Sequence, residues 1–79
     1  MSDSADLIRA FAEALVARPE SVRVREQQRG EETVVELSVD EEDRGRVIGR
    51  RGATAAALRT ILSAAAARRG ARCHLEILE

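Results

Sequence analysis

The 79-residue sequence has almost no aromatic side chains: Phe11 is present, and tryptophan and tyrosine are absent. Proteins that hold single-stranded nucleic acid usually stack bases on aromatic rings, at about 1–3 kcal/mol per base. Any nucleic-acid site in this chain must therefore use backbone and charge contacts. A site of that kind would hold a single strand in the micromolar range or more weakly.

Cysteine and histidine are scarce, with one residue of each, Cys73 and His74. They cannot form a disulfide framework or a four-ligand zinc site. Alternation along the last predicted strand places Cys73 inward as a small core residue and His74 on the surface. No nucleophile–base pair is evident, so we expect no enzyme activity, catalytic residue, metal, cofactor or small-molecule substrate.

Long apolar runs are also missing, since none approaches the about 20 residues that span a bilayer. The segment Met1–Asp6 contains two acidic residues and does not lead into a signal-peptide core. These absences predict a cytoplasmic protein without membrane contact. The length predicts one domain over residues 1–79.

Lysine is absent, and all thirteen basic residues are arginine. Residues 1–43 contain twelve acids and five arginines, whereas residues 44–72 contain eight arginines and no acid. The second block is a candidate anion-binding surface, because arginine suits bidentate phosphate contact. Two plainer explanations are open: a solvated helix face that balances the acidic half, and a GC-rich genome that favours arginine.

The apolar pattern predicts six elements in the order α-β-β-α-α-β. Ser4 or Asp3 would cap a first helix that ends before Pro19, and Gly70 would end the long helix. Three strands with three helices on one face predict an α+β domain. The predicted elements are a helix from Ala5, strands 21–26 and 33–39, helices 41–48 and 53–69, and a strand over 71–78.

Two local patterns support this assignment. Leu7, Phe11 and Leu15 follow one another at helical spacing, which predicts that Phe11 lies in the core. Asp40 is a good N-cap for the short helix, and Asp43 stands at the acceptor position of a capping box. The acidic run 40–43 lacks the spacing of a calcium loop.

The most informative stretch is Val47-Ile48-Gly49-Arg50-Arg51-Gly52, between two predicted helices. Two glycines three residues apart let the backbone turn sharply and let another chain approach closely. The turn leads into the N-terminus of the long helix, whose partial positive charge favours an anion. The plain alternative is a helix-turn-helix corner with a glycine cap.

The V-I-G-x-x-G motif between two helices resembles the signature of KH domains, and the element order resembles their type II form. Over nearly the whole chain the sequence is similar to the small free-standing bacterial KH proteins of the KhpA type. The resemblance implies that Gly49–Gly52 clamps the backbone of about four nucleotides, with Arg50 and Arg51 on phosphates. Val47 and Ile48, with a strand residue such as Val39, would line a groove for bases.

Arg46 and Arg59 are second-rank phosphate contacts on the same resemblance. The chain has Ala53 and Ala56 at positions where relatives often carry basic residues, which reduces the expected affinity. The resemblance further implies an RNA chaperone or post-transcriptional regulator that acts with a second KH protein of the KhpB or Jag type in cell-shape and cell-wall homeostasis.

A second hypothesis makes the chain an assembly subunit that uses this fold for homo- or heterodimerisation, with little RNA affinity. The alanines of residues 64–67 would allow close packing of the long helix against a second copy. Helix propensity alone also explains them.

Overall fold

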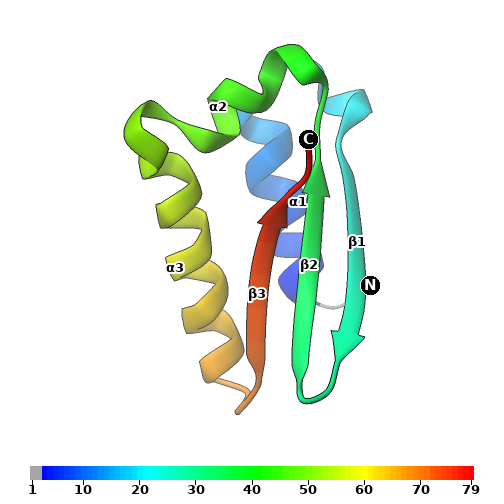
Figure 1. Cartoon of the computed structure of the whole chain (residues 1–79), viewed down its shortest axis with the longest axis vertical. Helices are drawn as coiled ribbons and strands as arrows, with labels where there is room; N and C mark the ends of the chain where they lie inside the picture. The colour runs from blue at the N-terminus through cyan, green and yellow to red at the C-terminus, as the bar shows by residue number, and fades with distance from the viewer. Residues whose placement is uncertain (1–2) are drawn as a thin grey trace.

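The computed structural model describes residues 3–79 and has the predicted element order (Figure 1). Residues 1 and 2 of the predicted domain lie outside the described part. Three short 3₁₀ turns, Pro19–Ser21, Glu41–Asp43 and Arg50–Gly52, connect these elements. The helices and strands are α1 (Asp3–Leu15), β1 (Arg23–Arg29), β2 (Glu32–Ser38), α2 (Arg44–Ile48), α3 (Ala53–Ala67) and β3 (Arg72–Ile77).

The three strands form a mixed sheet in the order β1-β2-β3. β1 and β2 are antiparallel, whereas β2 and β3 are parallel, so the chain must cross over between them through α2 and α3. β1 runs to Arg29, which pairs with Glu32. The hairpin turn is therefore Gly30–Glu31, tighter than the gap between the predicted strands 21–26 and 33–39. The predicted α+β fold class is confirmed.

The core lies between the sheet and the helices. In Figure 1, α1 crosses behind the sheet and α3 runs alongside β3. β2 is the central strand, and its residues Val35 and Leu37 have no exposed surface. The other buried apolar residues include Ala5, Ile8, Ala12, Val22, Val24, Val47, Leu58, Leu62 and Leu75.

The inward face of α1 differs from the prediction. Ala5, Ile8 and Ala12 are fully buried, whereas Phe11 is 38% exposed. The prediction that Phe11 lies in the core is wrong. The two alanines on either side of Ile8 allow close packing of this face of α1, and the larger Phe11 lies outside the buried stripe.

Side-chain contacts connect the start of α1 to the segment that follows α3. Ser4 and Asp3 both lie inside the helix, so neither is the N-cap that we expected, and Ser4 is buried. Arg69 donates a hydrogen bond to Ser4 Oγ and pairs with Asp3 at 3.6 Å. Cys73, which we expected in the core, is half-buried and packs against the core, with its Sγ 3.7 Å from the same oxygen.

A second set of contacts connects the segment that follows α1 to the start of α2. The carboxylate of Asp43, only 1% exposed, accepts the backbone N–H groups of Ala17 at 3.1 Å and Arg18 at 3.0 Å. Asp40 caps its turn as predicted, by accepting the N–H of Glu42 at 2.9 Å. The expectation that Asp43 completes a capping box is wrong, because its side chain reaches across the fold instead.

Among residues 3–79, no helix is long and apolar enough to cross a membrane.

Candidate nucleic-acid interface

The segment between α2 and α3 forms a tight turn. Gly49 donates its N–H to the carbonyl of Gly45 at 2.9 Å, which closes α2. Gly52 donates its N–H to the carbonyl of Gly49 at 3.1 Å. Both glycines have positive φ, 77° at Gly49 and 75° at Gly52. The chain therefore reverses within four residues and delivers the loop to the first turn of α3.

Gly49 is also required by packing. A Cβ at this position would lie 2.3 Å from Thr54 Oγ1 and 2.8 Å from the Thr54 backbone nitrogen. Real side chains do not approach so closely. At Gly52, by contrast, a Cβ would meet nothing within 4 Å. Gly49 thus lets Thr54 approach the backbone closely, whereas Gly52 is needed only for its left-handed backbone conformation.

Arg50 and Arg51 are both exposed, between the two glycines. Within residues 3–79, no hydrogen bond or ion pair joins either guanidinium group to the protein. Arg51 has a φ of 57° and is the only non-glycine of the described chain with positive φ. An arginine held in this uncommon conformation, with its charge unpaired, is suited to contact a ligand rather than to stabilise the fold.

The second-rank arginines each make a contact with the protein. Arg46 Nε lies 3.3 Å from Asp43, although its side chain is 61% exposed. Arg59 donates from Nε to the carbonyl of Leu75 at 3.4 Å, at the edge of β3 that borders α3. Both keep guanidinium nitrogens outside these contacts, but their side chains are positioned by the fold.

The two apolar residues before the loop have different environments. Val47 has no exposed surface and belongs to the core, so its predicted place in a groove for bases does not fit the structure. Ile48 is 38% exposed beside the loop. Val39 follows the end of β2 and packs against the core. The strand that borders α3 is β3, so Val39 is not the groove residue we expected.

Asp43 connects the loop's supporting helix to the rest of the protein. Burial alone would raise the pKa of Asp43, but the backbone hydrogen bonds from Ala17 and Arg18 outweigh it. The positive charges of Arg46 and Arg18 act in the same direction, so the pKa lies below the ordinary value of 3.8. The carboxylate that fixes the start of α2 is therefore ionised at neutral pH.

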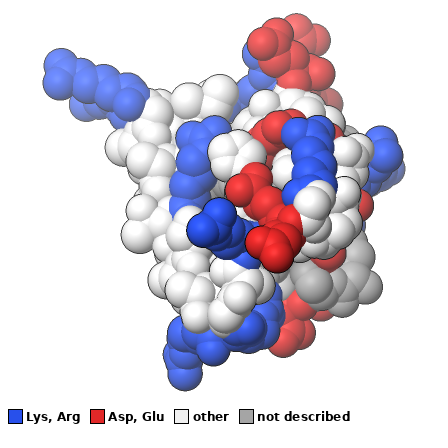
Figure 2. Space-filling view, turned by 60° about the horizontal axis from the view of Figure 1, so that its bottom comes forward, with Lys and Arg blue, Asp and Glu red and all other residues white. Residues whose placement is uncertain are grey.

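On the face drawn in Figure 2, acidic side chains are confined to one side, whereas basic ones occur on both. The side chains to the left in Figure 2, where α3 lies in Figure 1, are basic or uncharged, and the acidic ones lie to the right. From Ala53 to Arg72 the chain contains no acid. An anionic strand that leaves the loop along α3 meets no repulsion from that helix.

Two residues that support the loop could not be identified from the sequence. Thr54 packs on Gly49, and only its place just after the second glycine hinted at this contact. Asp43 reaches residues 25 and 26 positions away, for which no local pattern exists.

Comparison with known proteins identifies the family of this chain. The model of the KhpA/KhpB KH domain matches residues 5–77. The chain belongs to this family. A relative from Aquifex aeolicus is 44% identical over 79 residues, all of both chains. One from Halalkalibacterium halodurans is 44% identical over 73 residues, which are 92% of this chain and 96% of the relative.

Both of these KhpA/KhpB-family relatives are named RNA-binding protein KhpA, as is a third from Chlamydia pneumoniae that is 46% identical over 65 residues. The resemblance inferred from V-I-G-x-x-G is thereby confirmed. Membership in this KH family also agrees with the prediction that the chain is not an enzyme.

Proposed function

We propose that this protein binds single-stranded RNA and holds its sugar-phosphate backbone with the loop Gly49–Gly52. The observation that carries the proposal is the loop itself. Two unpaired, exposed arginines stand on a glycine turn at the N-terminus of α3, in a family whose relatives are named RNA-binding proteins. A helix N-terminus and arginine side chains both favour phosphate.

The predicted site residues contribute to RNA binding in different ways in this proposal. Arg50 and Arg51 contact phosphates directly, and Arg46 and Arg59 add charge from their anchored positions. Ile48 offers apolar surface beside the loop, and Val47 supports it from the core. Two to four phosphate contacts correspond to a slope of log K against log salt of about −1.5 to −3.

In the cell, we propose a single KH domain over residues 1–79 that acts in the cytoplasm as an RNA chaperone or post-transcriptional regulator. Its modest affinity makes a second RNA-binding unit useful, either another copy or a KH protein of the KhpB or Jag type. On the basis of the family resemblance, we also propose a role in cell-shape and cell-wall homeostasis.

The test is fluorescence anisotropy of a labelled single-stranded RNA pool, titrated at two salt concentrations. We expect wild type to bind with salt sensitivity and Arg50→Asp/Arg51→Asp to weaken binding about ten-fold or more, because phosphate contacts become repulsive. Aspartate tolerates positive φ better than most residues, so the fold should survive at Arg51.

The matched control is Arg23→Glu/Arg25→Glu on β1, which changes the net charge equally at exposed positions away from the loop. We expect this variant to retain most of the affinity. An equal loss in both variants would show that overall charge, rather than the loop, determines binding.

An assembly subunit is the second candidate function, and one observation favours it. Phe11 and Leu15 stand one turn apart on α1 and are 38% and 36% exposed. Apolar side chains at this exposure suit a protein interface. The assembly hypothesis predicts that neither wild type nor Arg50→Asp/Arg51→Asp binds RNA at high micromolar concentration, and that partner capture survives the loop change.

A further inference from the structure

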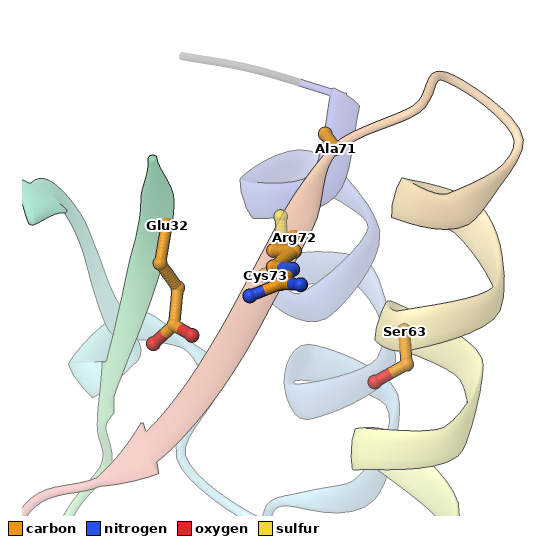
Figure 3. Close-up of a pocket in the computed structure, with 5 residues that line it drawn as sticks. All are labelled: Glu32, Ser63, Ala71, Arg72 and Cys73. Atoms are coloured by element: carbon orange, nitrogen blue, oxygen red, sulfur yellow. The ribbon is translucent and has the colours of Figure 1, made fainter. Parts of the chain in front are cut away.

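A small pocket lies at the opposite end of α3 from the loop. It has a volume of about 260 Å³ and is lined by Glu32, Ser63, Ala71, Arg72 and Cys73. Figure 3 shows Glu32 and Ser63 on opposite sides of β3, with the Arg72 side chain between them. The volume is below the about 300–1,000 Å³ of sites for drug-sized ligands. It suits one planar ring system rather than a large cofactor.

The pocket is lined by two opposite charges, Glu32 and Arg72. Glu32 and Arg72 are register partners on β2 and β3. Within residues 3–79, no ion pair or hydrogen bond joins these side chains to each other or to any other group, and the same holds for the Ser63 hydroxyl. A carboxylate, a guanidinium and a hydroxyl are therefore all available to a ligand.

The pocket lies along the same side of the molecule as the loop. The hydrogen bond from Arg59 to Leu75 marks the seam where α3 meets the edge of β3. Ser63 stands one helical turn beyond Arg59 on that seam. From Ala53, where α3 begins, to Ser63 the helix rises about 15 Å at 1.5 Å per residue. A strand of a few nucleotides held by the loop can reach this far.

We propose that this pocket receives a guanine base of the bound RNA strand; the inference rests on the proposed function. Glu32 accepts the N1–H and the 2-amino group of guanine, while Arg72 donates to O6 or N7, the base acceptors that arginine most often contacts. Guanine presents two donors beside such acceptors, whereas uracil presents a single N–H between two carbonyl oxygens. The Glu32 carboxylate repels phosphate, so this lining favours a base over the sugar-phosphate backbone.

The experiment compares three labelled oligonucleotides by fluorescence anisotropy: an all-uridine strand, the same strand with one guanosine, and the same strand with inosine in its place. We expect wild type to bind the guanosine strand roughly ten-fold more tightly than the all-uridine strand. Inosine lacks the 2-amino group, so the affinity for the inosine strand should lie between those for the guanosine strand and the all-uridine strand. Glu32→Gln should bind the guanosine and uridine strands within about two-fold of each other.

The matched control is Glu31→Gln, which removes the same charge from the adjacent exposed turn residue. It should retain the guanosine preference, although both variants gain some general affinity from the lost acid. If wild type binds all three strands equally, the inference is overturned while the proposed function stands. If wild type binds none of them, both fail.

A further titration separates a base in a strand from a free nucleotide. Guanosine monophosphate is added to the complex with the guanosine strand. We expect it to compete far more weakly than the unlabelled strand, because it lacks the loop contacts. Displacement by the mononucleotide at the same concentration as the strand would overturn the assignment to RNA.

Discussion

At Gly49 two independent requirements meet, one conformational and one steric. Its φ of 77° and ψ of 172° lie in a region that only glycine adopts readily, at a cost of about 1–3 kcal/mol for other residues. The overlap with Thr54 adds to that cost, because the Thr54 backbone nitrogen cannot rotate away as a side chain could. At Gly52 the conformation is left-handed helical and the space is open.

We predict that Gly49→Ala lowers the free energy of unfolding by more than about 3 kcal/mol, and that Gly52→Ala lowers it by about 1–2 kcal/mol. Urea denaturation followed by far-ultraviolet circular dichroism measures both values. RNA affinity, measured on the folded fraction, should fall more for Gly49→Ala. Equal destabilisation by the two changes would contradict the steric role of Thr54.

At the scale of elements, Asp43 determines how α2 is attached. Its ionised carboxylate accepts two backbone N–H groups from the segment that follows α1. The folded pKa lies below the ordinary value of 3.8. The stabilisation is therefore complete above the ordinary pKa and is lost as the pH falls through the lower, folded value.

We predict that Asp43→Asn lowers the urea midpoint at pH 7. The asparagine amide has one acceptor oxygen, so its NH2 group would face one of the two backbone N–H donors that the carboxylate accepts. The difference from wild type should shrink as the pH falls below the ordinary value of 3.8 and through the lower pKa of folded Asp43, where its carboxylate becomes protonated. The control Glu41→Gln, at an exposed position of the same turn, should differ little from wild type at any pH. A constant difference for Asp43→Asn down to pH 2 would refute the assignment.

The elements also show what the sequence could predict. Apolar periodicity predicted all six elements in order. The long helix ends at Ala67 rather than at the predicted residue 69, and Gly70, with a φ of 67°, lies in the turn that follows. Periodicity failed on the inward face of α1, because Leu7-Phe11-Leu15 and Ala5-Ile8-Ala12 both follow helical spacing. The choice between these stripes depends on how closely the helix approaches the sheet, which is a tertiary property.

The candidate site was predictable in its chemistry and less so in its geometry. The glycine spacing and the two arginines are local, so the loop could be identified from residues 47–52. The burial of Val47 and the position of β3 beside α3 depend on packing between distant segments. The approach of Glu32 to Arg72 requires the parallel register of β2 and β3, which no local pattern encodes.

At the scale of the whole molecule, one domain offers few contacts to RNA. The loop provides two unpaired arginines, and Phe11 on α1 is the one aromatic residue of the sequence. With about −0.7 in salt slope per phosphate, two to four contacts give binding that weakens readily with salt. Higher affinity must come from linking two domains on one RNA, which turns the second binding step into an intramolecular one.

We predict that two copies joined by a Gly/Ser linker of about 20 residues, with a span of roughly 25 Å, bind a long single strand at least about ten-fold more tightly than one copy. On a strand of about five nucleotides, which one domain fills, the gain should disappear. A tandem protein with Arg50→Asp/Arg51→Asp in one copy should bind the long strand like a single domain. If that variant keeps the full gain, the second copy contributes through protein contacts rather than through its loop, and the assembly function is the better account.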